Sequence, residues 1–283
     1  MLASAAMSTD GPPTDAQLRN LPYRAPEILH RYGADVHILG DPLALNLLAR
    51  LCSQSTHQPE INRLVGELYR SLLHVVIAAE FPRRPLTVET RMIAYTEAGV
   101  WRGEATATET PVVTVALARA GLLPSQVAFD LLNQILEPSG VRQDHLSLGR
   151  TTDAAGRVTG AGLHASKIGG TVDGAYVLIP DPMGATGSTV TKVLDHYASE
   201  ARGQPAKWLA VHLIVTPEYL RHVRTHHPEV TVYALRLDRG LSSPEVLATL
   251  PGERWAEERG LNDHHYIVPG AGGLGEIMNN SFV

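Results

Sequence analysis

The chemistry that this sequence predicts centres on residues 175–200, which read as a buried strand, a glycine-containing loop and a helix. A helix start exposes unpaired backbone N–H groups and a partial positive charge, which together form a site for a phosphate. Gly184 and Gly187 let the backbone close around an anion. Three side-chain hydroxyls add donors, at Thr186, Ser188 and Thr189. The loop therefore predicts a binding site for a sugar phosphate.

Asp181 stands at the end of the predicted strand, directly before this loop. A carboxylate in that place can accept hydrogen bonds from the ribose hydroxyls next to the phosphate. The alternative is an ordinary βα turn, in which Gly, Ser and Thr only turn the chain and cap the helix. The loop contains no Gly-Lys-Ser/Thr, and its glycines do not fit Gly-x-Gly-x-x-Gly, which argues against a Walker-type or dinucleotide-binding loop.

Residues 181–188, Asp-Pro-Met-Gly-Ala-Thr-Gly-Ser, resemble the phosphoribosyl pyrophosphate (PRPP) loop of the uracil phosphoribosyltransferase family. Pro182 and Ala185 point to this subfamily, because most other type I phosphoribosyltransferases carry acids at the corresponding positions. The resemblance implies that Asp181 acts in catalysis and that the loop binds PRPP. The implied PRPP-binding residues here are Asp181, Met183, Gly184, Ala185, Thr186, Gly187, Ser188 and Thr189.

Four further segments are similar to the family in the same chain order. Residues 40–43 and the helical run to Pro82 resemble its N-terminal helices. Residues 115–122, Val-Ala-Leu-Ala-Arg-Ala-Gly-Leu, resemble its pyrophosphate loop, which implies PRPP contacts from Arg119, Ala120 and Gly121. Residues 147–151 resemble the start of its mobile flap, where Arg150 is implied to reach the pyrophosphate.

The fourth segment, residues 266–272 with the sequence Tyr-Ile-Val-Pro-Gly-Ala-Gly, resembles the family's uracil-binding loop. Its glycines expose backbone N–H and C=O groups that can pair with the amide edge of a pyrimidine. The implied base-binding residues are Tyr266, Ile267, Gly270, Ala271, Gly272 and Gly273. The alternative is a glycine-rich turn with Tyr266 packed in the core.

The chain departs from the family pattern in two places. The family usually has Asp directly after Pro-Gly-x-Gly, where this chain has Gly273, so a polar anchor near the base and ribose is missing. Glu276 is the acid nearest in sequence that can compensate. An insert of about 20 residues, approximately 242–260, precedes the base loop. Three roles are open to this insert, which are to cover the base site, to enlarge an oligomer interface or to bind an effector.

The chemistry implied is displacement of pyrophosphate from C1 of the ribose by a ring nitrogen of a base. The sugar gains positive character and the departing pyrophosphate gains negative charge, so the site needs cations for the leaving group. Arg119 and Arg150 are the candidates. Mg²⁺ is expected as cofactor, bound mainly through PRPP and water, because only one acid stands at the loop. No protein metal site is predicted. His222 and His226 stand four residues apart, and a solvated helix face explains them better than a metal site.

The charge balance argues against nucleic acid and membranes as partners. The 283 residues include 24 Lys plus Arg and 29 Asp plus Glu, a net charge of −5, so no overall basic field attracts a polyanion. No apolar run approaches the ~20 residues that span a bilayer, and residues 1–14 do not read as a signal peptide. The single Cys52 excludes an intramolecular disulfide and fits a reducing compartment. We therefore expect a cytoplasmic protein.

The elements that must position these residues are those of an α/β fold of the type I phosphoribosyltransferase kind. We expect a mostly parallel sheet flanked by helices, with a flap hairpin and a C-terminal base-binding loop. Asp41 predicts the N-cap of a helix over 42–51, and apolar spacing predicts a second helix over 61–81. These two helices form either a packing layer or a dimer surface. Besides the 175–200 unit, strands are expected at 111–117, 208–215 and 230–237, and helices at 124–136 and 217–226.

The chain is expected to divide into a flexible N-terminal arm, residues 1–25, and a single phosphoribosyltransferase domain, residues 26–283. Four prolines discourage regular structure in the first segment. Glycine-rich residues 148–172 correspond to the flap, for which a plain exposed hairpin is the alternative. Residues 243–245 read as a helix start inside the insert.

Three functions follow from this sequence. The first is an enzyme that joins uracil to PRPP to give UMP and pyrophosphate in pyrimidine salvage. The second is the same chemistry on a different base, which Gly273 and the insert favour. The third is a catalytically silent regulator that senses PRPP or nucleotides. By analogy with the family, we expect a homodimer or a higher homo-oligomer, formed partly by the helices between residues 41 and 81.

Overall fold

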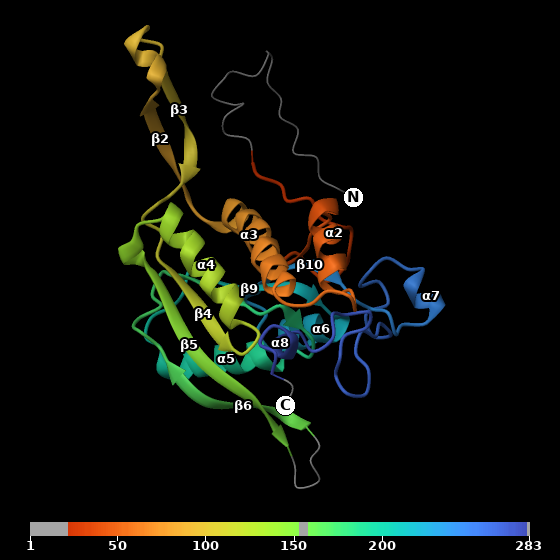
Figure 1. Ribbon diagram of the computed structural model, residues 1–283. Coiled ribbons are helices and arrows are strands. Elements are labelled where there is room, and N and C mark those ends of the chain that lie inside the picture. Colours follow the sequence, from red (N-terminus) through yellow and green to blue (C-terminus); the bar gives the residue numbers. More distant parts are fainter. Residues whose placement is uncertain (1–21, 153–157, 282–283) are drawn as a thin grey trace.

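A sheet with helices on both faces forms the centre of the molecule (Figure 1). The computed structural model describes residues 22–152 and 158–281, with the backbone alone for 150–152 and 158–161. Within these residues eight strands join one sheet in the order β1, β10, β9, β7, β4, β5 and β6, with β8 beside β9. Their bounds are β1 Val36–Ile38, β4 Val112–Ala118, β5 Val141–Thr152, β6 Val158–Lys167, β7 Tyr176–Pro180, β8 Met183–Gly184, β9 Lys207–Val215 and β10 Val230–Leu237. Neighbouring strands are parallel except β5 and β6, which confirms the expected α/β fold.

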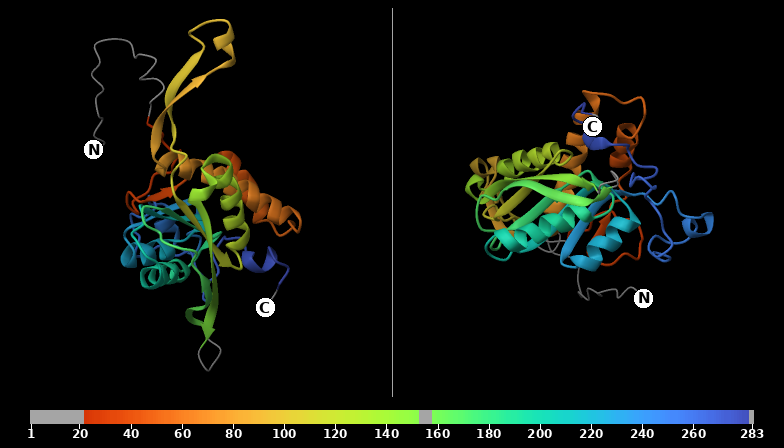
Figure 2. Two further views of the ribbon diagram at one scale, coloured as in Figure 1. Left: turned by 90° about the vertical axis from the view of Figure 1, so that its left-hand side faces the viewer. Right: turned by 90° about the horizontal axis from the view of Figure 1, so that it is seen from below.

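Alternating side chains of the central strands face two separate cores. In β7, Leu178 faces the first core, while Val177 and Ile179 face the second, as the two-residue period of a strand requires. The first core is completed by helices α2 (Pro42–Leu51), α3 (Glu60–Glu80) and α4 (Leu122–Ile135), and the second by α5 (Ser188–Glu200) and α6 (Pro217–His226). Figure 2 shows α4 and α5 on opposite faces of the sheet when the molecule is seen from below. Burial on both faces explains why these strands read as continuous apolar runs.

The two N-terminal helices lie where the sequence predicts them. The side chain of Asp41 caps α2 by accepting hydrogen bonds from the N–H groups of Leu43 and Ala44. A stripe of buried residues along α3 packs toward the sheet and α4, and it includes Ile61, Leu64, Val65, Leu68 and Leu72. Helix α3 is therefore a packing layer. No helix in the described ranges combines the length and apolar content that a membrane crossing requires.

A long β-hairpin that the sequence analysis did not predict projects from the body (Figure 1). Its antiparallel strands are β2 (Arg83–Glu89) and β3 (Val100–Thr106), and the 3-10 helix η1 (Arg91–Ala94) lies between them in sequence. Several large apolar side chains stay exposed on this 83–106 hairpin, namely Leu86, Val88, Met92, Ile93, Tyr95 and Trp101. Such a concentration of exposed apolar groups is typical of a contact surface.

The hairpin formed by β5 and β6 occupies the place expected of the flap. At its base the buried Asp144 accepts hydrogen bonds from Arg142 Nε at 2.9 Å, from the Tyr197 hydroxyl at 2.8 Å and from Gly169 N–H at 2.8 Å. These contacts tie both strands of the hairpin to α5. A short 3-10 helix, η2 (Pro138–Gly140), leads into β5. Residues 153–157 of the expected flap and 1–21 of the expected N-terminal arm lie outside the described residues.

The insert at 242–260 forms an ordered loop at the outer edge of the molecule. Its helix α7 (Pro244–Leu247) begins at Ser243, whose side chain caps it as the sequence predicts. Glu258 is fully buried and accepts hydrogen bonds from Arg239 Nη1 at 2.8 Å and from Gly252 N–H at 2.9 Å. The hydroxyl of Tyr32 also donates to Glu258. A buried ion pair therefore fastens the insert to the body.

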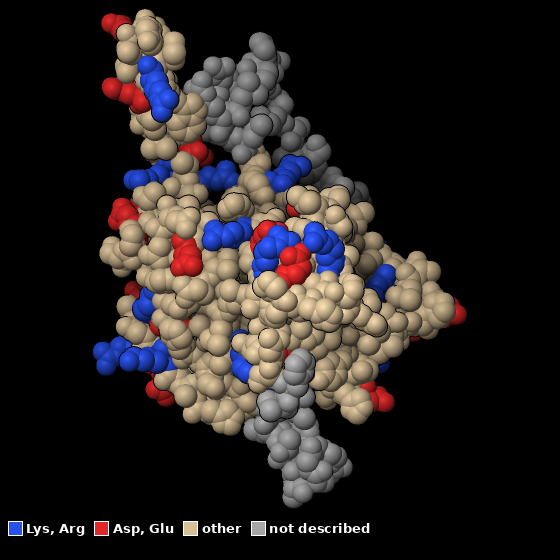
Figure 3. Space-filling view, in the orientation of Figure 1, with Lys and Arg blue, Asp and Glu red and all other residues tan. Residues whose placement is uncertain are grey.

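Acidic and basic side chains are interspersed on the face shown in Figure 3. On α3, for example, Arg63 pairs with Glu60 at 2.6 Å and also with Glu67. This face therefore offers no extended basic surface to a polyanion, in keeping with the net charge.

Candidate active site

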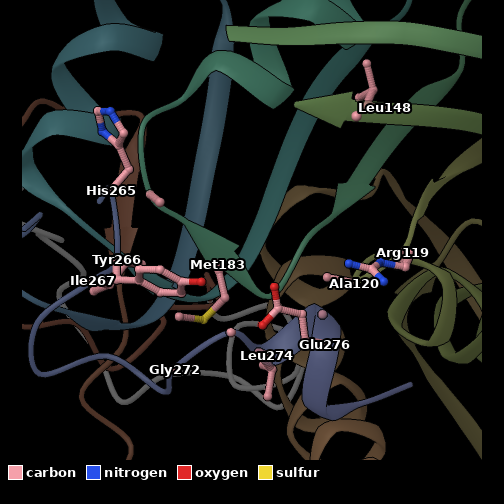
Figure 4. A pocket seen from close by; sticks show the side chains of 14 residues that line it. Arg119, Ala120, Leu148, Met183, His265, Tyr266, Ile267, Gly272, Leu274 and Glu276 are labelled. Atoms are coloured by element: carbon pink, nitrogen blue, oxygen red, sulfur yellow. The ribbon is translucent and has the colours of Figure 1, made fainter. Parts of the chain in front are cut away.

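A cavity of about 490 Å³ opens where several strands of the parallel sheet end (Figure 4). Its lining comes from the loop after β4, from β5, from the loop after β7 and from the terminal loop. The lining residues are Arg119, Ala120, Leu148, Gly149, Met183, Ala185, His265, Tyr266, Ile267, Gly272, Gly273, Leu274, Gly275 and Glu276. The carboxyl ends of parallel strands are the usual ligand-binding edge of such sheets. The fold thus brings four of the five predicted segments to one place.

The loop between β7 and α5 has the geometry of an anion cradle. Gly187 at the start of α5 has a φ of +86°, which strains any residue with a side chain, and a Cβ there would lie 2.9 Å from His222 Cδ2. The N-cap residue Gly187 has no side chain to cap α5, and the N–H of Ser188 makes only a long hydrogen bond, 3.4 Å, to Thr186 Oγ1. The hydroxyls of Thr186 and Ser188 lie 2.9 Å apart beside the first turn. The helix start therefore leaves backbone N–H groups and hydroxyls available to a phosphate.

Asp181 is partly buried just beneath this loop and does not line the cavity. Burial raises the pKa of Asp181 to about 6, and the N–H of Met183, which donates to Oδ1 at 3.3 Å, opposes that shift. Burial is the main cause of the raised pKa of Tyr69 and of Tyr219, and the nearby charge of the Asp181 carboxylate adds to both shifts. A group with this pKa is mostly ionised at pH 7 and can accept hydrogen bonds from sugar hydroxyls.

A buried histidine that the sequence analysis missed supports the backbone at Asp181. His212 in β9 is fully buried, with Nδ1 2.5 Å from the carbonyl oxygen of Asp181 and Nε2 2.5 Å from the hydroxyl of Tyr219. A carbonyl can only accept, so Nδ1 carries the proton and Nε2 accepts from Tyr219. Burial lowers the pKa of His212 to about 4, which keeps the ring neutral. The signal in the sequence is a lone polar residue inside the apolar run of β9.

Arg119 follows β4 directly and lies exposed at the cavity. Its Nη1 donates to Ser281, to Oγ at 2.9 Å and to the carbonyl oxygen at 3.3 Å. The chain behind it is tightly packed, since a Cβ on Gly121 would lie 2.9 Å from both Leu117 Cβ and Pro180 O. Arg119 is therefore presented on a closely fitted loop, with its side chain held by the C-terminal segment.

Arg150 lies on β5, where its backbone pairs with Ala161 of β6. Its side chain belongs to the part outside the described residues. The contact of Arg150 with pyrophosphate therefore stays a prediction.

The terminal loop divides into lining residues and supporting residues. Tyr266, Ile267, Gly272 and Gly273 line the cavity. Gly270 and Ala271 do not line it and lie buried beneath it. The N–H of Gly270 donates to Asp238 Oδ2 at 2.7 Å, and its carbonyl accepts from Arg236 Nη2 at 3.2 Å. Both backbone groups of Gly270 are thus used inside the protein, which leaves the lining residues to face a ligand.

The insert at 242–260 contributes no residue to this cavity. An adjoining cavity of about 620 Å³ lies between α6 and residues 261–265, and it shares His265 with the first. The His222 and His226 rings there lie 4.3 Å apart, and His226 Nδ1 lies 2.8 Å from the carbonyl oxygen of His222. Among the described residues no three His, Cys, Asp or Glu side chains gather in a group that could hold a metal ion.

A comparison with known families agrees with this geometry. The family profile described as uracil phosphoribosyltransferase matches residues 38–252. The chain belongs to the uracil phosphoribosyltransferase family. It is accordingly a phosphoribosyltransferase, an enzyme of the pentosyltransferase class.

Individual members of the uracil phosphoribosyltransferase family align with most of this chain. The uracil phosphoribosyltransferase of Caldanaerobacter subterraneus subsp. tengcongensis is 25% identical over 244 residues, which are 86% of this chain and 97% of that protein. The corresponding enzyme of Dictyoglomus thermophilum is 27% identical over 86% of this chain and 98% of its own. Among solved structures, the AQ2163 protein from Aquifex aeolicus superposes with a TM-score of 0.65 at 23% identity, covering 88% of this chain and 99% of that one. That likeness supports the fold.

Proposed function

We propose that this phosphoribosyltransferase joins uracil to PRPP and releases UMP and pyrophosphate. The observation that carries the proposal is the single cavity of about 490 Å³, whose lining combines the loops after β4 and β7 with β5 and the terminal loop. Each of these segments has a separate task in the transfer, and one ligand-sized space adjoins all of them.

The donor half of the site is assigned to the loops after β4 and β7. Residues 184–189 and the start of α5 bind the 5′-phosphate, because backbone N–H groups and hydroxyls gather there. Asp181 accepts hydrogen bonds from the ribose hydroxyls. Arg119, together with Arg150 from the flap, neutralises the departing pyrophosphate. The Ser281 contact orients the Arg119 guanidinium for this task.

The acceptor half is assigned to the terminal loop. Tyr266, Ile267, Gly272 and Gly273 line the cavity. Figure 4 shows Tyr266 and Ile267 on the side away from Arg119. Backbone groups in this stretch match the alternating carbonyl and N–H groups of uracil. Gly270 and Ala271 support the loop from below.

Magnesium belongs to the proposal as a cofactor that reaches the site with PRPP. Only one acid, Asp181, stands at the loop after β7, so the cation is held mainly by substrate oxygens and water. When bound there, it supplies positive charge to the pyrophosphate.

The test is to incubate the purified protein with PRPP, Mg²⁺ and single bases, and to measure pyrophosphate release and the nucleotide formed. We expect UMP with uracil and no product with purines. Turnover with another base in place of uracil supports the second candidate, a related transferase, which the absence of a side chain at Gly273 favours. PRPP binding without turnover of any base supports a regulator and contradicts the proposal.

We also propose that the protein works in the cytoplasm as a homodimer or higher homo-oligomer. The 83–106 hairpin is the surface that best fits a second copy, because it projects from the body and carries exposed apolar side chains such as Met92, Tyr95 and Trp101. The helices between residues 41 and 81 stay the alternative surface, because only one stripe of α3 is buried and its other face is exposed. Sedimentation of the wild-type chain and of a Tyr95→Ser, Trp101→Ser variant tests it, with a smaller species expected for the variant.

A further inference from the structure

Glu276 on the short helix α8 (Leu274–Ile277) places a carboxylate in the cavity, and the assignments proposed above for the donor and acceptor halves do not use it. Figure 4 shows this side chain between Met183 and the Arg119 loop, with Tyr266 on the far side of Met183. Among the lining residues, all of which belong to the described part, Glu276 is the acid and Arg119 is the arginine. The two opposite charges thus lie toward the same end of one cavity, with the base-binding side chains beyond Met183.

The space for this carboxylate exists because residue 273 is a glycine. A Cβ on Gly273 would lie 3.1 Å from Glu276 Cδ and closer still to Oε2. The backbone of Gly273 has a φ of −76°, which any residue adopts, so chain geometry does not require a glycine there. A side chain at 273 and the present side-chain position of Glu276 exclude each other, and the flexible end of Glu276 is the part that would have to move.

The backbone that carries Glu276 is firmly held. Its N–H donates to the carbonyl oxygen of Gly273 at 2.9 Å, and its own carbonyl accepts from the N–H of Ser281 at 3.1 Å. Gly275 packs against Ala120, because a Cβ on Gly275 would lie 3.2 Å from Ala120 Cβ. The segment that presents Glu276 is therefore fixed against the loop that presents Arg119.

The carboxylate itself has no hydrogen-bond or ion-pair partner among residues 22–149 and 162–281, whose side chains the structure describes. Glu276 is partly buried, and a charged group that loses water without gaining a partner costs free energy. Such a group is retained where a ligand supplies the partner. The sugar of PRPP, which must lie between the base and the pyrophosphate, fits this position.

Building on the proposed function, we propose that Glu276 is a catalytic residue that contacts the transferred sugar. As the bond from C1 to the pyrophosphate oxygen breaks, its electron pair leaves with pyrophosphate and the sugar becomes cationic. The Glu276 carboxylate stabilises that charge, while Arg119 stabilises the leaving group. A ring nitrogen of the base then bonds to C1, and its proton passes to solvent water. Glu276 forms no covalent bond with the sugar.

The test compares Glu276→Gln, which keeps the shape and removes the charge, with Gly273→Ala, which forces the carboxylate away. Glu200→Gln, at the exposed C-terminal end of α5, is the matched control. Turnover is measured with the base that the wild-type chain uses, and PRPP affinity is measured by calorimetry with Mg²⁺. We expect kcat to fall about 100-fold or more in both cavity variants. The PRPP dissociation constant should change much less, and Glu200→Gln should match the wild type.

The outcomes separate the two proposals. Wild-type turnover together with an unchanged kcat in Glu276→Gln overturns the role of Glu276 alone. Weaker PRPP binding with an unchanged kcat in Glu276→Gln assigns it to uniform binding of PRPP and likewise overturns the catalytic role. A wild-type chain that converts no base overturns the proposed function, and the catalytic role of Glu276 with it.

Discussion

The imidazole of His212 connects the carbonyl oxygen of Asp181, 2.5 Å from Nδ1, to the hydroxyl of Tyr219, 2.5 Å from Nε2. This chain of two hydrogen bonds joins β9 and α6 to the residue at which β7 turns into the loop that we propose binds the phosphate. It lies in a fully buried region, where an unsatisfied polar group is costly. The position of the loop therefore depends on residues that never touch the ligand.

Tyr219→Phe removes one hydroxyl from this chain and leaves His212 Nε2 buried without a donor. We expect the free energy of unfolding to fall by about 1–3 kcal/mol, and PRPP affinity to fall with it, because the loop loses a support. Chemical denaturation and calorimetry measure the two effects. Tyr233→Phe is the matched control, because the buried Tyr233 hydroxyl donates to Glu80 Oε1 at 2.7 Å and lies outside the His212 chain. Equal losses of PRPP affinity in both variants would argue against a special role for His212.

The dependence of stability on pH should show the effects of two titrating groups, His212 and Asp181, that act in opposite directions. The pKa of His212 is lowered from 6.5 to about 4, so the folded state binds fewer protons than the unfolded state between these values, and stability falls as pH falls. The pKa of Asp181 is raised from 3.8 to about 6, so stability rises as pH falls through that range. The two effects largely cancel in the wild type between about pH 4 and 6. Asp181→Asn should therefore lose stability more steeply on acidification, which denaturation at pH 7, 6, 5 and 4 measures. A profile parallel to the wild type would contradict the assignment.

Asp181→Asn should also weaken the use of PRPP at pH 7. An amide cannot accept hydrogen bonds with the strength of a carboxylate, so we expect kcat/KM for PRPP to fall about 10-fold to 100-fold. Steady-state kinetics with varied PRPP measure this. The far-ultraviolet circular dichroism spectrum should be unchanged, and unaltered kinetics would remove Asp181 from the proposed site.

Gly187→Ala tests the cradle itself. The φ of +86° and the closeness of His222 act together, so we expect a loss of about 2–3 kcal/mol in stability and a clear loss of PRPP affinity. Gly174→Ala is the control, because Gly174 also has a positive φ, +65°, but a Cβ there meets nothing within 4 Å. It should cost about 1 kcal/mol and leave PRPP affinity unchanged. Comparable affinity in the two variants would place the phosphate elsewhere.

Glu258→Gln tests whether the insert is structural. The substitution removes the charge of the buried Glu258 and leaves the partly buried Arg239 without its charge partner, and breaking such a pair costs about 3–5 kcal/mol. We expect a large drop in the melting temperature, with kcat per folded molecule unchanged because the insert does not line the cavity. A changed base preference with normal stability would instead connect the insert to substrate choice.

Much of this fold could be predicted from signals in neighbouring residues of the sequence. Asp41 with Pro42 marked the start of α2, and Ser243 with Pro244 marked the start of α7, because capping and a fixed proline φ are properties of neighbouring residues. The loop after β7 was recognisable for the same reason. The anion cradle at Gly187 depends on adjacent glycines and hydroxyls.

Features that depend on distant residues escaped prediction. The strand β1 has three residues and exists because it pairs with β10, far along the chain. The strand β2 has both faces exposed and carries the charged residues Arg83, Arg84 and Glu89, so its sequence lacks the apolar pattern of a buried strand. The position of Glu276 follows from empty space at Gly273, which only the packed structure reveals. Hydrogen bonding of His212 likewise needed the placement of α6 against β9.

Arg119 and Glu276 lie toward one end of the cavity and Tyr266 lies toward the other, so the cavity has a charged end and an uncharged end. The anionic part of the donor is drawn to the Arg119 guanidinium, whereas an uncharged base gains nothing from that end. Binding of the donor in the opposite orientation is therefore disfavoured. The residues that line the cavity align the two reactants before the reaction begins.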